Sequence, residues 1–278
     1  MPRTRLHYIS HRVLIGLGLV FALWSGSCGD SIRKEPGLID LVAAQGTSQY
    51  RLLTINAPDT AANNPAMADL IAKSDADLAI RYSSRAGGPA GGFSGFPERL
   101  GGLLAPRASD GAAASALVIA FDSQRFKVDS AKNVDLLPGA GPKPTGMLDA
   151  VLTERLNNRS IRLIAVRLDA PTPAARQALV EAVAKQSLAR RQVGVPVIVV
   201  AFVDTGELAA DTRAFMTGEG LATPDLAQHS PRMIEISRAG SASVFADRQL
   251  EGIVASDNEG QLNLPGGGGL GQVAVRRR

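Results

Sequence analysis

The sequence predicts an α/β (α+β) domain built as a sandwich of two β-sheets. Short apolar runs rich in β-branched residues recur between residues 50 and 275, and helical patterns lie between some of them without a regular strand–helix alternation. The composition is that of a globular protein, with 45% hydrophobic and 20% charged residues. With an N-terminal segment set aside, the 278-residue chain has the length of one such domain.

The first half of the domain is expected to contain two buried strands and one helix. Residues 52–55 form a β-prone run that ends at Asn56, and residues 78–80 form a second one. Between them a proline follows Asn64, at the position that proline favours at the start of a helix. The Gly- and Pro-rich residues 87–102 are expected to form a long surface loop.

The second half is expected to be richer in strands. Residues 116–121 and 125–128 are predicted as adjacent strands joined by a turn, and residues 138–146, with three prolines and three glycines, as a loop. The other predicted elements are a strand at 161–168, a helix at 174–191, a strand at 197–200, and short strands near 233–236, 243–246, 253–254 and 272–275.

Residues 1–27 have the pattern of an export signal. A basic stretch runs to Arg12, an apolar run of about twelve residues follows, and three small residues precede Cys28. A bilayer-spanning helix needs roughly 20 apolar residues, so a cleaved signal is favoured over a permanent span. Small residues that end at a cysteine resemble the lipobox of bacterial lipoproteins, although Ser25 stands where that motif usually has leucine. Ordinary cleavage after Ser27, giving a secreted protein, and an uncleaved anchor are the alternatives.

The only cysteine of the chain stands where lipidation would use it. A spare thiol is a liability in an oxidising compartment, and acylation of Cys28, for example with palmitate, would remove it. Residues 28–48 are then expected to be the lipidated cysteine and a tether, and residues 49–278 the folded domain. Gly29 does not resemble the aspartate that commonly retains lipoproteins at the inner membrane, which favours the outer membrane of a bacterial cell envelope. Without lipidation the protein would be secreted or periplasmic.

Charge and histidine content limit the function classes. Thirty basic residues exceed twenty-six acidic ones, but six of the basic residues lie in the N-terminal segment or in the final run of three arginines. The rest of the chain carries no basic excess, so nucleic acid is not favoured as a partner. Beyond the N-terminal segment the only histidine is His229, which is expected to be an exposed loop residue. With one cysteine and this one histidine, an intramolecular disulfide, a Cys/His zinc cluster or a two-histidine mechanism cannot be built.

Five sequence blocks, taken in order, resemble the endonuclease/exonuclease/phosphatase (deoxyribonuclease-I-like) superfamily. They are RLLTIN (51–56), DADLAIRYS (75–83), IRLIAVRLDAP (161–171), PVIVVAFVDTG (196–206) and Ser256-Asp257-Asn258. In the superfamily the first block ends in an asparagine of the metal and phosphate site. The second block reads D-x-D-V-V-A-L-Q-E, the third N-x-H-L, the fourth P-V-I-x-x-G-D-F-N and the last S-D-H. The resemblance covers about residues 50 to 275 and implies the two-sheet sandwich of that superfamily.

The resemblance also implies metal-assisted phosphodiester hydrolysis, in which Mg²⁺ takes hard oxygen ligands and an aspartate–histidine pair stabilises the developing charge. Asn56 and Asp257 match the superfamily. Five positions depart from the superfamily. Ser83 replaces the metal-binding glutamate, Arg167 replaces the histidine of N-x-H-L, and Asn258 replaces the final histidine. In the G-D-F-N block, Phe202 replaces the aspartate and Asp204 replaces the asparagine. We therefore expect a domain that keeps the fold and has lost the reaction.

The function expected from this pattern is that of a catalytically degenerate binding or scaffold module without a cofactor. Its partners would be a membrane, reached through the lipid anchor, and an envelope protein or an anionic ligand. The alternative is a divergent metal-dependent phosphodiesterase or phosphatase in which Asn56, Asp204 and Asp257 act around Mg²⁺ or another divalent cation, with Asn56 and Asp204 as candidate metal ligands. A third possibility is an exported α/β domain unrelated to this superfamily.

Each candidate residue also has a purely structural interpretation. Asn56 precedes a turn, where asparagine is common. Arg167 suits an anion in the former catalytic pocket, and it equally suits an ion pair with Asp204 or Asp257. Asp169, Asp204 and Asp257 are aspartates of loops and turns as well as candidates for an oxygen-rich cation site. The sequence therefore assigns no catalytic or metal-binding residue outright.

Overall fold

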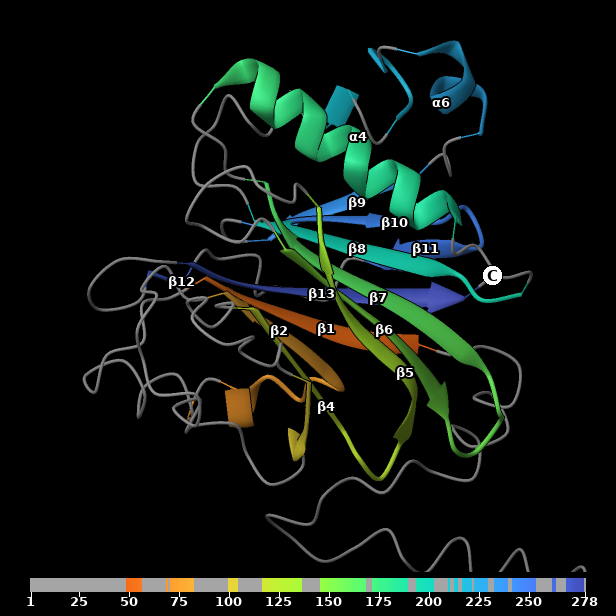
Figure 1. The fold of residues 1–278 in the computed structure, drawn as a ribbon. Coiled ribbons are helices and arrows are strands. Elements are labelled where there is room, and N and C mark those ends of the chain that lie inside the picture. Colours follow the sequence, from red (N-terminus) through yellow and green to blue (C-terminus); the bar gives the residue numbers. More distant parts are fainter. Residues whose placement is uncertain are drawn as a thin grey trace, which may run out of the picture. The chain divides into compact units, whose positions relative to one another are not determined.

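In the computed structural model, two mixed β-sheets lie face to face (Figure 1). The first sheet has the strand order β11 (Leu250–Ile253), β13 (Gly269–Arg277), β1 (Gln49–Asn56), β2 (Leu78–Tyr82), β4 (Leu117–Phe121) and β3 (Gly102–Leu104), and β12 (Leu262–Asn263) also pairs with β13. The second sheet has the order β5 (Phe126–Asp135), β6 (Gly146–Glu154), β7 (Ser160–Arg167), β8 (Val197–Phe202), β10 (Ala242–Ala246) and β9 (Ile234–Ala239). The predicted two-sheet α/β sandwich is confirmed.

The structure describes residues 49–56, 69, 71–82, 100–104, 117–136, 146–168, 172–189, 194–202, 210, 213–214, 217–221, 223–229, 233–239, 242–253, 262–263 and 269–277. All of them belong to one compact unit, Gln45–Arg278. Cys28, Ser83, Asp169, Asp204, Asp257 and Asn258 lie outside the described residues.

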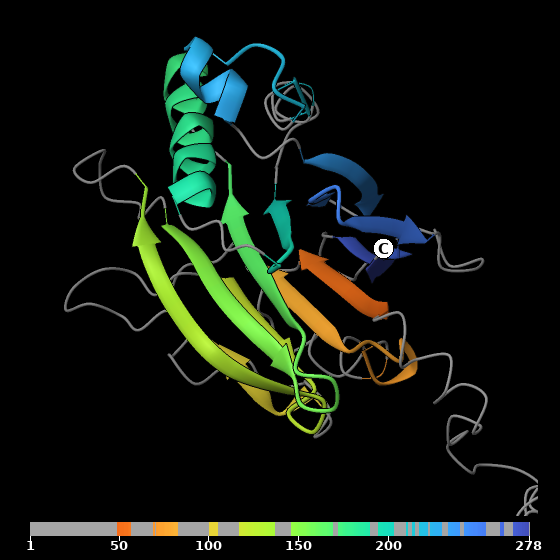
Figure 2. The same ribbon diagram turned by 90° about the vertical axis from the view of Figure 1, so that its right-hand side faces the viewer.

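Each sheet has one parallel pair of strands at its centre. β1 runs parallel to β2, and β7 runs parallel to β8, whereas the other neighbouring strands are antiparallel. Parallel neighbours need a crossover connection, and α4 (Pro173–Ala189) provides it between β7 and β8. α4 covers the outer face of the second sheet, with α6 (Pro224–His229) beside it (Figure 2). In the part of the chain that the structure describes, no helix is long and apolar enough to cross a membrane.

The main core fills the space between the two sheets. Tyr50 and Leu52 of β1 and Ile80 of β2 point inward and pack in one cluster with Leu163 of β7 and Val200 of β8. These side chains alternate along their strands with residues of the outer face, as the pleat of a strand requires. The sandwich is therefore closed by side chains from both sheets.

The outer faces of the central strands are buried as well. Ile164 of β7 packs with Leu179 of α4 on the second sheet, and Leu53 of β1 packs with Ile71 on the first. Strands that are buried on both faces have nearly continuous apolar sequences. This explains why the runs at 52–55, 78–80 and 197–200 could be recognised in the sequence.

The structure corrects the predicted pairing around residue 122. Residues 116–121 and 125–128 were expected to be adjacent strands, but β4 belongs to the first sheet and β5 to the second. The turn at Asp122 carries the chain from one sheet to the other, and the backbone N–H groups of Arg125 and Phe126 donate to the Asp122 carbonyl. Turns within a sheet and between sheets use the same local residues, so the sequence does not distinguish them.

Several element boundaries also differ from the prediction. β6 begins at Gly146, in a region whose strand was not predicted, and β3 begins at Gly102, where a loop was expected. The long helix ends at Ala189, and Gly194, with a φ of 81°, lies in the connection to β8. His229 is the last residue of α6 and does not lie in the expected loop.

Candidate functional site

The carboxyl ends of the two parallel pairs bring four residues to one end of the sandwich. Asn56, the last residue of β1, lies in register with Tyr82, the last residue of β2. Arg167, the last residue of β7, lies in register with Phe202, the last residue of β8. Three of these residues are the positions at which the sequence blocks resemble or depart from the superfamily's site, which makes these four residues the candidate functional site. We call Asn56, Tyr82, Arg167 and Phe202 the strand-end cluster.

Side chains from both sheets meet in the strand-end cluster. The rings of Tyr82 and Phe202 are tilted by 36°, with their centroids 5.6 Å apart. The guanidinium carbon of Arg167 lies 5.0 Å from the centroid of the Tyr82 ring. Both rings are buried, whereas Asn56 and Arg167 are half-buried. The cluster therefore places a cation over an aromatic pair that joins the two sheets.

The chemistry of the strand-end cluster suits an anion better than a metal ion. A guanidinium group is always charged and presents its N–H donors in a planar fork that matches phosphate or carboxylate. The positive charge of Arg167 opposes a divalent cation nearby, and Phe202 has no ligand atom. Among the described residues, no three His, Cys, Asp or Glu side chains gather as they would around a metal ion.

Sequence reasoning found three members of the strand-end cluster and missed one. The structure brings Asn56, Arg167 and Phe202 to the same end of the fold. The missed residue is Tyr82, which supplies the contact between the sheets. Its position in the sequence could have identified it. Tyr82 directly precedes Ser83, and it alternates with Leu78 and Ile80 on the face of β2 that points toward the other sheet. The roles predicted for Ser83, Asp204, Asp257, Asn258 and Cys28 stay predictions, since these residues lie outside the described ranges.

The same arrangement of sheets occurs in solved structures. An endonuclease/exonuclease/phosphatase from Bacteroides vulgatus superposes with a TM-score of 0.61 at 11% identity, over 83% of this chain and 99% of that one. The chain has the endonuclease/exonuclease/phosphatase fold. The human Nocturnin catalytic domain with a bound sulfate anion gives 0.55 at 14% identity, over 82% of this chain and 94% of that one. ANGEL2, a 2′,3′-cyclic phosphatase, in complex with adenosine-2′,3′-vanadate superposes with a TM-score of 0.58 at 10% identity, over 84% of this chain and 96% of that one.

No protein-family model and no curated protein sequence matches the chain. At these identities the solved structures establish the endonuclease/exonuclease/phosphatase fold and leave the activity to the residues of the site.

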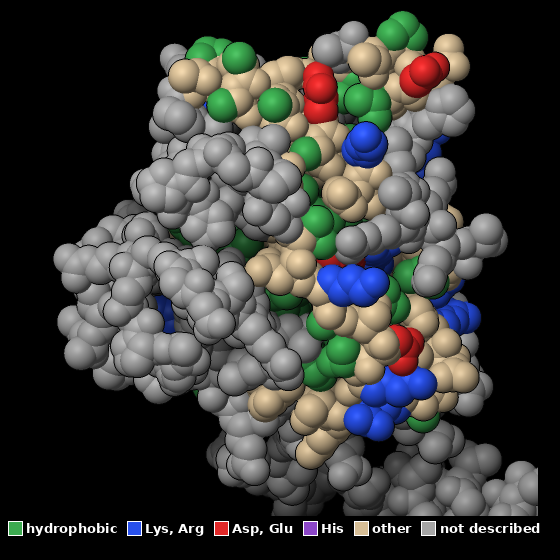
Figure 3. Space-filling view, in the orientation of Figure 1, with side chains coloured by type: hydrophobic (Ala, Val, Ile, Leu, Met, Phe, Trp, Pro, Cys, Tyr) green, Lys and Arg blue, Asp and Glu red, His purple; other side chains and the backbone are tan. Residues whose placement is uncertain are grey.

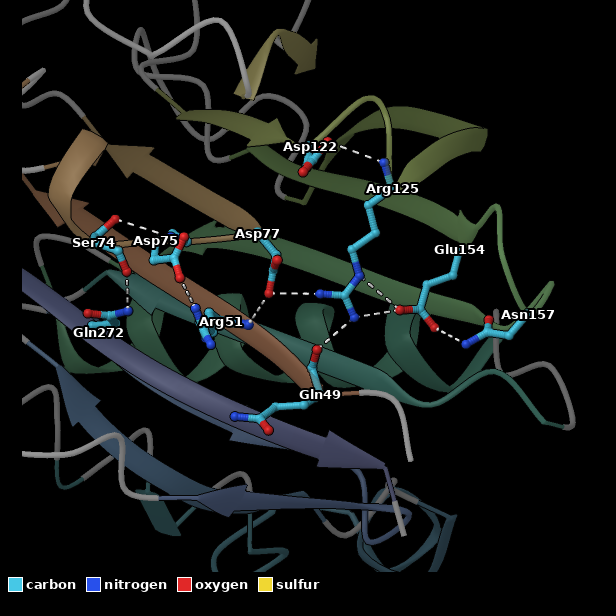
Figure 4. Close-up of polar contacts among 11 residues, drawn as sticks. Gln49, Arg51, Ser74, Asp75, Asp77, Asp122, Arg125, Glu154, Asn157 and Gln272 are labelled. Carbon is cyan, nitrogen blue, oxygen red and sulfur yellow. Dashed lines mark hydrogen bonds and ion pairs between the residues drawn. The ribbon is translucent and has the colours of Figure 1, made fainter. Parts of the chain in front are cut away.

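At the other end of this endonuclease/exonuclease/phosphatase fold, one arginine joins the two sheets (Figure 4). Arg125 Nη1 lies 2.9 Å from Asp77 Oδ2, next to β2 of the first sheet. Arg125 Nε donates to Glu154 Oε1, at the end of β6 of the second sheet, over 3.0 Å. Arg125 Nη2 donates to the carbonyl of Gln49 over 2.7 Å. We call Arg125, Asp77, Glu154 and the Gln49 carbonyl the Arg125 clamp.

The environment of Arg125 keeps it charged. Burial alone would lower the pKa of Arg125, but the charges and hydrogen bonds of Asp77 and Glu154 outweigh burial and raise this pKa above its ordinary value. The guanidinium carbon also lies 5.4 Å from the ring centroid of Tyr50 and 5.1 Å from that of Phe126. Because all these contacts are internal, the Arg125 clamp is a structural feature and not a second candidate site.

Two of the C-terminal arginines, Arg276 and Arg277, are also held by contacts within the fold. Arg276 forms an ion pair with Glu251, and Arg277 Nη2 donates to the carbonyl of Gly194 over 2.7 Å. On the face shown in Figure 3, the described Lys and Arg side chains form separate groups with acidic side chains among them. The described residues of this face therefore form no continuous basic stripe of the kind that tracks a nucleic-acid backbone.

Proposed function

We propose that this chain is a noncatalytic binding domain of the bacterial cell envelope that uses the strand-end cluster to hold an anionic ligand. The observation that carries the proposal is the Arg167 guanidinium over the Tyr82 ring, at the carboxyl ends of the central strands. The resemblance to the superfamily places its metal and phosphate site at the same strand ends. The group presented there is a permanent cation with a fork of hydrogen-bond donors.

The residues at the strand ends support the loss of phosphoester hydrolysis. Phe202 stands where the resemblance places an aspartate, and it is fully buried. Arg167 stands where the resemblance places a histidine. A phenyl ring cannot orient or deprotonate water, and a guanidinium group does not exchange a proton near neutral pH. Removing one member of a catalytic unit costs several orders of magnitude in rate, so two such replacements support a noncatalytic role.

Known ligands of the same fold support an oxyanion as the ligand class. Nocturnin holds a sulfate anion, and ANGEL2 holds adenosine-2′,3′-vanadate. Both ligands present several anionic oxygens, which are the acceptors that an arginine fork recognises. For this chain we propose a phosphate- or carboxylate-bearing ligand that binds without a metal ion.

The location in the cell envelope is supported by the N-terminal segment. Residues 1–27 combine basic, apolar and small residues in the order of a lipoprotein signal, and Cys28 follows. Lipidation of Cys28 would tether the domain to a membrane, and the outer membrane is the favoured one. The residues between Cys28 and Gln49 would then link the anchor to β1.

The loss of catalysis is tested by direct assay. We expect the purified full-length protein to show no turnover above a protein-free blank with DNA, a bis-aryl phosphodiester, a phosphomonoester or a sphingomyelin-type lipid. Each substrate is assayed with Mg²⁺, Mn²⁺ and Ca²⁺, and an active endonuclease of the same fold serves as the positive control. The reason is that the strand ends present Arg167 and Phe202 in place of the proton-transfer groups.

Variants decide the outcome if turnover is found. Asn56→Ala and Asp257→Ala remove the two residues that match the superfamily, and Asp69→Ala removes an exposed carboxylate elsewhere as the matched control. Metal-dependent turnover that is lost in the first two variants and kept in the third would overturn the noncatalytic proposal. It would establish instead the divergent hydrolase that uses Asn56, Asp204 and Asp257.

Anion binding is tested by calorimetric titration with inorganic phosphate in the presence of a metal chelator. We expect Arg167→Ala to weaken the affinity about 10- to 100-fold, because a hydrogen bond to a charged group contributes about 1.5–3 kcal/mol. Arg213→Ala is the control, since Arg213 is an exposed residue paired with Glu235, and it should leave the affinity unchanged. Equal affinity in the wild type and Arg167→Ala, or binding only after metal is added, would contradict an arginine-based site.

A further inference from the structure

The hairpin between β6 and β7 ends in a tip, residues 155–159, that carries an isolated apolar side chain. Leu156 is 85% exposed, more than Val128 at 38% or Ile234 at 46%, the other exposed large hydrophobic residues of the described chain. A single exposed leucine is ordinary on a protein surface, so its surroundings decide whether it has a role.

The tip has a defined conformation. The side-chain amide of Asn157 donates to Glu154 Oε2 over 2.6 Å, and the backbone N–H of Asn158 donates to the Glu154 carbonyl over 2.9 Å. Asn158 has a φ of 59°, the left-handed conformation that asparagine tolerates better than most residues. Leu156 is therefore presented at the outermost part of a hydrogen-bonded turn.

Basic residues flank the exposed leucine on both sides. Arg155 is exposed and Arg159 is half-buried. The Nε of Arg155 donates to the carbonyls of Ser123 and Phe126, over 3.1 and 3.3 Å, which holds this side chain beside the tip. At a membrane surface an exposed apolar side chain can enter the acyl-chain region while neighbouring arginines reach the headgroups, and the tip presents Leu156 with an arginine on either side in this way.

The tip lies at the end of the sandwich where the chain enters the domain. Arg125 donates to the Gln49 carbonyl, and the Arg125 carbonyl accepts the backbone N–H of Arg155 over 2.8 Å. One arginine thus connects the first residue of β1 with the base of the hairpin (Figure 4). Cys28 precedes Gln49 by 21 positions, a stretch that can span at most about 75 Å when fully extended.

We propose that the hairpin tip, residues 155–159, contacts the anionic membrane surface to which the chain is anchored, with Leu156 inserted and Arg155 and Arg159 at the phosphate groups. This inference rests on the lipid anchor of the proposed function. It adds an orientation: the end with the Arg125 clamp faces the bilayer, and the strand-end cluster at the other end faces away from it. A tether alone would leave the orientation open, whereas a second contact fixes it.

Site-directed fluorescence tests the contact in the full chain. Cys28 is the only cysteine, and the proposed acylation would consume it, so Leu156→Cys provides a single thiol for an environment-sensitive fluorophore. Ala174→Cys is the matched control, because Ala174 is exposed in the first turn of α4, after the carboxyl end of β7. Mass spectrometry of the Cys28 peptide and flotation with vesicles establish the anchor first. The vesicles consist of phosphatidylcholine with or without phosphatidylglycerol.

The expected result is a blue shift of emission and loss of quenching by an aqueous quencher at position 156, in vesicles with phosphatidylglycerol, and neither effect at position 174. Arg155→Gln should lower the membrane-contact equilibrium about fivefold, since a basic residue near an anionic surface contributes about 1 kcal/mol. If the protein floats with the vesicles but the label at position 156 stays in water, the hairpin contact is overturned and the lipid anchor is kept. A chain that carries no lipid and does not float overturns the anchor, and this inference with it.

Discussion

Replacing Arg125 with alanine is expected to lower the free energy of unfolding by about 3 kcal/mol, because it leaves two partly buried carboxylates without their common cation. The side chain of Glu154 is 5% exposed and that of Asp77 is 19% exposed, so water replaces the guanidinium group only in part. The variant also loses the packing of the arginine over the rings of Tyr50 and Phe126.

Urea unfolding, followed by circular dichroism, measures this loss. Arg213→Ala is the matched control: its ion pair with Glu235 is at the surface, and the expected change is within about 0.5 kcal/mol. Arg125→Lys should recover only part of the stability, because an ammonium group cannot reach Asp77, Glu154 and the Gln49 carbonyl with the geometry of a fork. An Arg125→Ala variant as stable as the control would show that the clamp does not hold the sheets together.

Replacing Arg162 with methionine is expected to lower the free energy of unfolding by about 4 kcal/mol, because the buried carboxylate of Asp149 then loses its bidentate contact with the guanidinium group. The two residues form a bidentate pair across β6 and β7, with Nε to Oδ1 at 2.7 Å and Nη2 to Oδ2 at 2.6 Å. Their side chains are only 7% and 5% exposed. Removing one partner of such a pair is costly, since the other keeps its desolvation penalty.

The double variant Arg162→Met/Asp149→Leu separates the cost of a buried charge that has lost this contact from the contribution of the pair. We expect it to recover most of the lost stability, because an apolar pair carries no desolvation penalty. Urea unfolding of the wild type, both single variants and the double variant gives the coupling energy. A double variant no more stable than Arg162→Met would be inconsistent with the lost contact between Arg162 and the buried Asp149 carboxylate as the main cost.

The strands that the sequence predicts best are those buried on both faces. β1, β2 and β8 contain the largely apolar runs 52–55, 78–80 and 197–200, and such runs are visible without knowledge of the fold. β6 was not predicted because Asp149 and Glu154 interrupt its apolar pattern. Each of these acids is buried against an arginine elsewhere in the chain, Arg162 of β7 or Arg125 of the turn before β5. A local pattern carries no information about such a partner.

Most residues of the candidate site could be predicted from the order of the sequence blocks. The contacts among these residues could not be predicted from the sequence. Block order placed Asn56, Arg167 and Phe202 at strand ends, and the topology brings these ends together. The residue that connects them, Tyr82, touches side chains from the other sheet. Contacts between sheets depend on how the sheets stack, which no spacing within one strand determines.

The pairing of the first strand with the last one has a consequence for biosynthesis. β1 lies between β2 and β13, and Thr54 Oγ1 donates to the carbonyl of Gly271, 217 residues further along the chain. Contacts of such high sequence separation slow folding, and β1 has no neighbour on that side until the ribosome has made the C-terminal strand. If the chain is exported as proposed, this delay keeps the nascent chain open for translocation. A prematurely terminated product would expose the free edge of β1 and become prone to aggregation.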